Sequence, residues 1–187
     1  MNSQFDIDKL SWLNGMWIRE NLSDAELMQR FVNWKFNSEL FAKVLPEAKT
    51  RINTLSDMVD LAGHFVGGIP SYDPALLTAG KAGEDATRQA LQFFIWQLEG
   101  LRSWEKSEIF AIAKAVATFH ELKIKDFLEP IFVAITGKTS STSVLDAMEI
   151  LGSDLSRARL RVALAHIGVS KKQAKNIERA YRDYPQA

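Results

Sequence analysis

The segment Pro130-Ile131-Phe132-Val133-Ala134-Ile135-Thr136-Gly137 is the most informative part of this chain. Two short motifs follow it: Ile150-Leu151-Gly152 and, seven residues after that glycine, Arg159-Leu160. Gly152 and a later Gly168 fall where helices are expected to end in a left-handed cap, and Ser170 is a residue type that starts helices. This part of the sequence therefore predicts a series of helices separated by glycine turns.

The rest of the chain is also typical of helices. Residues 23–26 form a capping box, because the Ser23 hydroxyl and the Glu26 carboxylate can each satisfy a free backbone N–H. Asp73-Pro74 is predicted to be an N-cap with proline at the first helical position. Few segments alternate with period two, so we expect an all-α chain, with residues 67–71 (Gly-Gly-Ile-Pro-Ser) as its best linker. Apolar residues recur at helical spacing at Leu27, Phe31 and Trp34, at Ala86, Ala90, Phe93, Phe94 and Leu98, and at Ile109, Ile112, Ala113, Val116 and Phe119.

The composition is that of an ordinary globular protein. Of its 187 residues, 47% are hydrophobic and 25% are charged, which is enough for one large core or two small ones. No apolar run reaches the roughly 20 residues that span a bilayer, and the first residues do not resemble a secretory signal. There is no cysteine, which excludes disulfides, thiolate metal sites and a cysteine nucleophile. We expect a cytoplasmic protein that does not contact membranes.

The charge is unevenly distributed although the net charge is zero. From Arg157 onward the chain has eight basic and two acidic residues, a net charge of +6, and the preceding part carries −6. A basic end can attract phosphate groups. A solvated helix face that happens to be rich in lysine explains the same count.

No catalytic or metal-binding constellation is visible. Thr136-Gly137-Lys138-Thr139 resembles part of a P-loop, but Phe132 occupies the position where that loop needs its first glycine. His166-Ile167-Gly168 is interpreted as a helix end and a turn, and no serine lies in a nucleophile elbow. None of the three histidines has a second histidine three or four residues away or a cysteine nearby, and carboxylates alone give no support for a metal site. A free-standing enzyme is therefore disfavoured, and neither a catalytic residue nor a metal ligand is predicted.

The motifs together resemble the C-terminal region of bacterial glutamyl-tRNA synthetases. That family carries P-L-R-x-A-x-T-G, then L-L-G, then R-L, which are similar to residues 130–137, 150–152 and 159–160. Near the start, residues 5–19 resemble the F-x-x-x-K-L-x-W-x-N-x-x-Y-I-R segment that follows the catalytic loop in the family. Arg51-Ile52-Asn53-Thr54-Leu55 is similar to its R-x-x-T-L. The resemblance runs nearly end to end and in the family's order.

The resemblance implies an all-α, two-part helical anticodon-binding region of the class I aminoacyl-tRNA synthetase type. Residues 1–73 would be a helical stem-contact domain and residues 74–187 a helical anticodon-binding domain. The parent enzyme would be an ATP- and Mg²⁺-dependent glutamate–tRNA ligase of protein synthesis. This part would have no catalytic centre and no cofactor, because the catalytic domain precedes it in the family. Its partner would be glutamate tRNA, and we expect it to act as a monomer.

The resemblance also assigns roles to individual residues. Arg51 would read the last anticodon base, and an ion pair at a helix start is the structural alternative. Phe132 replaces the arginine of the family motif, and its ring either stacks on a base or packs in the core. The remaining contacts implied or expected are to the anticodon from Ser141, Thr142 and Val144, and to phosphates from Arg159, Lys171, Lys172 and Lys175. The alternative function is a helical protein-interaction module that does not bind nucleic acid.

Overall fold

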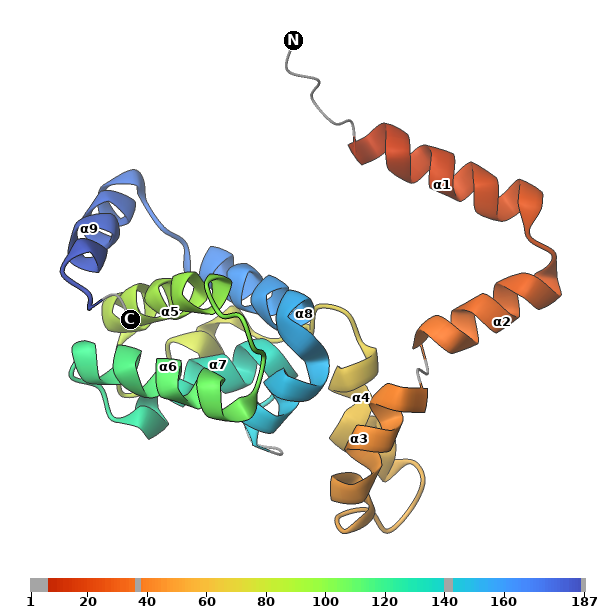
Figure 1. Cartoon of the computed structure of the whole chain (residues 1–187), viewed down its shortest axis with the longest axis horizontal. Helices are drawn as coiled ribbons and strands as arrows, with labels where there is room; N and C mark the ends of the chain where they lie inside the picture. The colour runs from red at the N-terminus through yellow and green to blue at the C-terminus, as the bar shows by residue number, and fades with distance from the viewer. Residues whose placement is uncertain (1–6, 36–37, 140–142, 186–187) are drawn as a thin grey trace. The chain divides into compact units, whose positions relative to one another are not determined.

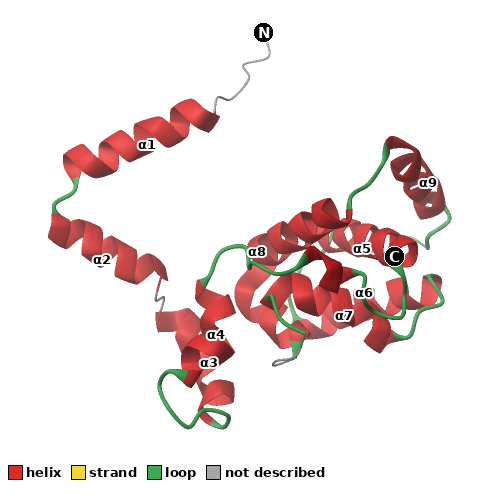
Figure 2. Cartoon of the chain, turned by 180° about the vertical axis from the view of Figure 1, so that it is seen from behind, coloured by secondary structure: helices red, strands yellow, loops and turns green. Residues whose placement is uncertain are grey.

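The structure is a computed structural model that describes residues 7–35, 38–139 and 143–185. Throughout these ranges the chain forms helices joined by turns and loops, and no β-strand occurs in them (Figure 2). This confirms the predicted all-α class. No helix in the described ranges combines the length and the apolar character that a membrane span requires. The chain divides into two compact units, Met1–Ala42 and Lys43–Ala187.

The first unit contains helices α1 (Ile7–Asn21) and α2 (Asp24–Lys35). The predicted capping box starts α2: Ser23 N–H donates to Glu26 Oε2 at 3.0 Å, and Glu26 N–H donates to Ser23 Oγ at 3.3 Å. The Arg30 guanidinium lies 5.4 Å from the centre of the Trp17 ring, a cation–π distance. Both helices expose large apolar side chains, namely Leu10, Trp12, Leu13, Trp17, Leu27, Met28, Phe31 and Val32.

Helix α3 (Ser38–Lys49) crosses the boundary between the units, and α4 (Asp57–Val66) follows it in the second unit. Asp73 caps the short 3-10 helix η1 (Pro74–Leu77), because its carboxylate accepts the Ala75 N–H at 2.9 Å. The predicted N-cap is thus confirmed, although it starts a single 3-10 turn.

The core of the second unit is a bundle of four helices, drawn together in Figure 1. Helix α8 packs against α7 and α5, and α6 lies beside α5 and α7. The apolar face predicted around Phe93 and Phe94 is fully buried except at Ala86, which is half-buried. The face predicted from Ile109 to Phe119 is mostly buried, with Phe119 36% exposed at its end. The bundle helices are α5 (Glu84–Glu99), α6 (Lys106–Phe119), α7 (Ile124–Thr136) and α8 (Val144–Ile167).

Glycines with positive φ end or break the helices where the sequence predicts them. Gly152 has φ +80° and interrupts α8, and Gly168 has φ +78° and ends it. Their ψ values of 171° and 144° place them in the extended part of the positive-φ region, so the caps are not the left-handed helical ones expected. Ser170 then starts α9 (Lys171–Arg182) with a full capping box to Gln173.

The compact units do not divide at the predicted linker. The structure places that division at Ala42, whereas residues 67–71 connect α4 to η1 inside the second unit. The physical reason is that Ala62 and Phe65 of α4 are buried and that the Gly67 and Gly68 carbonyls are hydrogen-bonded to α8. The functional division into a stem-contact part (1–73) and an anticodon-binding part (74–187) remains a prediction.

Candidate nucleic-acid interface

The loop that carries Arg51 is hydrogen-bonded to the first residue of α4. Helix α3 ends just before it, with the Arg51 N–H donating to the Ala48 carbonyl at 2.9 Å. The Asp57 carboxylate accepts the N–H groups of Asn53 at 2.7 Å and Thr54 at 2.9 Å, and also the Thr54 hydroxyl. These hydrogen bonds, that of the Thr54 N–H first, lower the pKa of Asp57. The hydrogen bonding of this loop was not predicted. The signal for it was Thr-x-x-Asp at 54–57, which is similar to the pattern of a capping box.

Arg51 itself is exposed, and its side chain has no hydrogen bond or ion pair with the described residues. The alternative of an ion pair at a helix start therefore finds no partner among those residues. An exposed guanidinium on an ordered loop is available to form two parallel hydrogen bonds with a base edge.

The segment after α7 lies beside α4. The Lys138 ammonium donates to the Asp60 carbonyl, which belongs to the helix that starts directly after the Arg51 loop. Gly137 caps α7 in the left-handed conformation, and the Thr136 hydroxyl donates to the Phe132 carbonyl at 2.8 Å. The Thr-Gly-Lys sequence therefore ends a helix.

The predicted anticodon contacts of this segment are only partly described. Ser141 and Thr142 lie outside the described residues. Val144 is the first residue of α8, and its side chain is buried, with 5% of its surface exposed. A contact of the Val144 side chain with a base is therefore wrong, because the side chain packs inward. Its backbone N–H remains one of the first-turn donors that a helix leaves unpaired.

Phe132 lies on α7 and is half-buried. The ring is thus neither a full member of the core nor a freely exposed stacking platform.

Arg159 does not lie on the surface. Only 1% of the residue is exposed, so the predicted phosphate contact is wrong. Its guanidinium donates to four backbone carbonyls, those of Gly68 at 3.0 Å, His64 at 2.6 Å, Gly67 at 2.8 Å, and Ile135. Burial lowers the pKa of Arg159 to about 10, which leaves the side chain charged at neutral pH.

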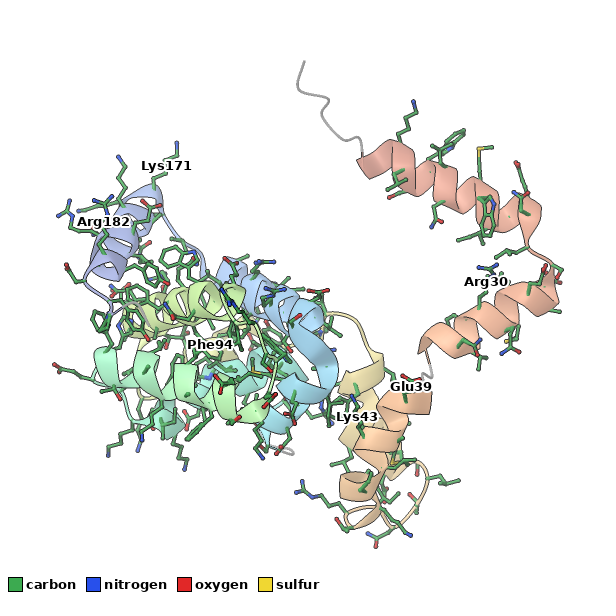
Figure 3. The ribbon with its side chains drawn as sticks, viewed as in Figure 1. Arg30, Glu39, Lys43, Phe94, Lys171 and Arg182 are labelled. Atoms are coloured by element: carbon green, nitrogen blue, oxygen red, sulfur yellow. The ribbon has the colours of Figure 1, made fainter. Side chains whose placement is uncertain are left out.

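Helix α9 presents a basic, exposed face. It contains five basic residues and one acidic residue. In Figure 3 the Lys171 side chain points away from the bundle, whereas Phe94 lies among the bundle helices. The five exposed basic side chains, called the α9 basic face from here on, are Lys171, Lys172, Lys175, Arg179 and Arg182.

The opposite side of α9 holds it on the bundle. Ile177 is buried, and the Gln97 amide donates to the Tyr181 hydroxyl at 2.6 Å. Arg88, which is 4% exposed, donates to the Gly168 carbonyl at 2.7 Å and forms ion pairs with Glu84 and Asp85 on its own helix. Sequence reasoning missed Arg88, because a buried arginine has no local signature. These anchors keep the α9 basic face directed to solvent.

An apolar groove of about 1050 Å³ lies between α5, α6 and the end of α9. Aromatic rings form part of its wall, among them Trp96, Phe119, Tyr181 and Tyr184. The rings of Tyr181 and Tyr184 are stacked with their centres 5.8 Å apart. A surface of this kind is what the protein-interaction alternative requires.

Comparison with known proteins identifies the family. The sequence profile of the family described as "Anticodon binding domain" matches residues 25–164. The glutamate–tRNA ligase of Pseudoalteromonas translucida (strain TAC 125) is 86% identical over 98% of this chain, and that of Marinomonas sp. (strain MWYL1) is 49% identical over 96%. The chain spans about 37% and 36% of the length of these two relatives.

A solved structure shares the fold. It is the crystal structure of a glutamate tRNA ligase from Elizabethkingia meningosepticum in complex with its amino acid, with a TM-score of 0.61 and 17% sequence identity. The match covers 88% of this chain and 33% of that one. The predicted resemblance is thus confirmed, and none of these comparisons supports the protein-interaction alternative. The chain belongs to the anticodon binding domain family, in the form found in glutamate–tRNA ligases.

Proposed function

We propose that this chain is the tRNA-selecting part of a glutamate–tRNA ligase and that it binds the anticodon of glutamate tRNA. In this proposal the catalytic part of the ligase lies outside the chain. There, ATP and Mg²⁺ activate glutamate before its transfer to tRNA. The protein would act as a monomer in the cytoplasm, where translation takes place.

The observation that carries the proposal is the arrangement around α4. The exposed Arg51 lies on a loop ordered by Asp57, and the same helix receives the Lys138 hydrogen bond from the segment after α7. The first turn of α4, which follows the Arg51 loop, and the segment after α7 therefore lie side by side although they are far apart in sequence. Unpaired nucleotides are recognised by this kind of surface, which offers planar donors to base edges and backbone groups at loop-to-helix junctions.

The remaining contacts of the proposal are of two kinds. Base contacts would come from Ser141, Thr142, the Val144 N–H and, by stacking, the partly exposed Phe132 ring. Phosphate contacts would come from the α9 basic face, with Lys171, Lys172 and Lys175 as its first members. Phosphate contacts position the RNA without reading its sequence, so specificity would rest on Arg51 together with these other base contacts.

A binding experiment with the 187-residue chain tests the proposal. The ligands are an anticodon stem-loop of glutamate tRNA and a version with the last anticodon base changed. We expect the wild type to prefer the matched stem-loop, and Arg51→Gln to lower that preference by roughly 5- to 150-fold, since a bidentate arginine–base pair contributes about 1–3 kcal/mol.

Arg102→Gln is the matched control, because Arg102 is another exposed arginine, located between α5 and α6 and outside the proposed surface. It should retain the wild-type preference. Equal binding of both stem-loops by the wild type would end the proposal. An unchanged preference in Arg51→Gln would remove Arg51 from it.

A further inference from the structure

The side chain of Arg159 joins the ends of two helices. Three of its acceptor carbonyls, those of His64, Gly67 and Gly68, lie at the C-terminal end of α4 and just beyond it. The fourth, that of Ile135, lies in the last turn of α7. The last four carbonyls of a helix have no partner within the helix, so Arg159 supplies donors where both helices need them.

The electrostatics favour the same arrangement. A helix C-terminus carries partial negative charge, and here two such ends meet one buried guanidinium. No carboxylate is among the described hydrogen-bond partners of Arg159. Only arginine offers five N–H donors in a rigid plane, whereas a lysine ammonium is a point charge with three donors. The geometry thus requires the guanidinium shape in addition to the positive charge.

The two helices held by Arg159 lead to the two segments of the proposed anticodon surface. Helix α4 starts after the Arg51 loop, and α7 ends at the segment that contains Lys138, Ser141 and Thr142. The hydrogen bond from Lys138 to the Asp60 carbonyl is a second link between the same elements. A change in the angle between α4 and α7 would therefore move Arg51 relative to the other base contacts.

We infer that Arg159 is a positioning residue for anticodon reading, which holds α4 against α7 and α8 and thereby fixes where Arg51 meets the last anticodon base. This inference rests on the proposed function. It does not place Arg159 in contact with tRNA. The residue acts through Arg51.

The test measures the ratio of affinities for the matched and mismatched stem-loops, well below the melting temperature of each variant. Partial unfolding lowers both affinities equally and leaves this ratio unchanged, so the ratio separates positioning from stability. We expect Arg159→Lys, which keeps the charge and loses the planar fork, to lower the ratio by roughly 2- to 30-fold. The loss should not exceed that of Arg51→Gln.

Arg88→Lys is the matched control, because Arg88 is also a buried arginine that donates to a backbone carbonyl at a helix end. Its acceptor is the carbonyl of Gly168, the C-cap of α8 at the turn into α9, and not a carbonyl of α4 or α7. It should therefore leave the ratio as in the wild type even if affinity falls. The double variant Arg51→Gln/Arg159→Lys should have the same ratio as Arg51→Gln alone, because Arg159 has nothing left to position.

The outcomes separate the inference from the proposed function. A wild type without any preference refutes the proposed function. A wild type with a preference that Arg159→Lys retains refutes the inference alone. A lower affinity ratio in the double variant than in Arg51→Gln also refutes the inference, because Arg159 would then act independently of Arg51. An equal loss of the ratio in Arg88→Lys refutes it as well, because any destabilising change in the bundle would then have the same effect.

Discussion

The stability of the second unit should fall in mild acid because of His64. This residue on α4 is 7% exposed, and neither ring nitrogen has a hydrogen-bond partner among the described residues. Burial, followed by the positive charges of Arg159 and Lys138, lowers the pKa of His64 from 6.5 to about 4. In the unfolded chain the pKa returns to its ordinary value, so between pH 6.5 and 4 the unfolded state binds more protons than the folded state.

The sign and size follow from this difference. Stability from the neutral His64 is fully present above pH 6.5 and is lost as the pH falls toward 4. The difference corresponds to at most about 3 kcal/mol, of which about 2 kcal/mol is lost by pH 5. Urea unfolding followed by circular dichroism should therefore show a smaller drop between pH 7 and pH 5 for His64→Leu than for the wild type.

Carboxylates titrate in both the wild type and His64→Leu, so their contribution to the pH dependence of the unfolding free energy cancels when the two proteins are compared. Above pH 7 the two unfolding free energies should differ by a constant amount, which serves as an internal control. Parallel pH profiles down to pH 4.5 would show that His64 is protonated equally easily in both states, and the argument from its burial would fail.

Four further predictions concern the α9 basic face, the Arg51 loop, the turn after α7 and a glycine inside α4. Replacing Lys171, Lys172 and Lys175 by glutamine should lower the slope of log affinity against log salt by roughly 2, because fewer counterions are released; an unchanged slope would make them ordinary solvated residues. Asp57→Asn should speed amide exchange in the Arg51 loop and reduce anticodon discrimination, and it fails if exchange is unaltered. Gly137→Ala should destabilise the fold by about 1–2 kcal/mol in thermal melts, since φ is +74° there, whereas Gly63→Ala in α4 should stabilise it by about 0.5–1 kcal/mol.

The features predicted correctly from sequence are those with local causes. The capping box at Ser23, the helix start at Ser170 and the breaks at Gly152 and Gly168 depend on the residue itself and on neighbours within three or four positions. Spacing along one helix likewise predicted the buried face around Phe93. The family resemblance added the order of motifs, which the comparisons confirm.

The features that were missed depend on distant parts of the chain. Arg159 was predicted to be on the surface, because a basic residue in a basic segment is usually solvated. Its acceptors are backbone carbonyls up to 95 residues away, and a carbonyl has no side-chain signature. The burial of the Val144 side chain was missed for the same reason, because the burial of a helix start depends on which parts of the chain pack over it. The compact units also do not divide at the glycine-rich segment 67–71, because α4 before it packs against α8 after it.

The basic character of the C-terminal part is narrower in the structure than in the sequence. Of its eight basic residues, Arg159 is buried, Arg157 pairs with Asp154, and Arg161 pairs with Glu99. The other five are the α9 basic face, and α9 is a separate helix from α4, which follows the Arg51 loop. The attraction of tRNA phosphates, which does not depend on the RNA sequence, and the reading of anticodon bases would therefore be carried by different elements. Salt dependence should respond to α9 and discrimination to Arg51 and Arg159, so each property can be changed while the other is retained.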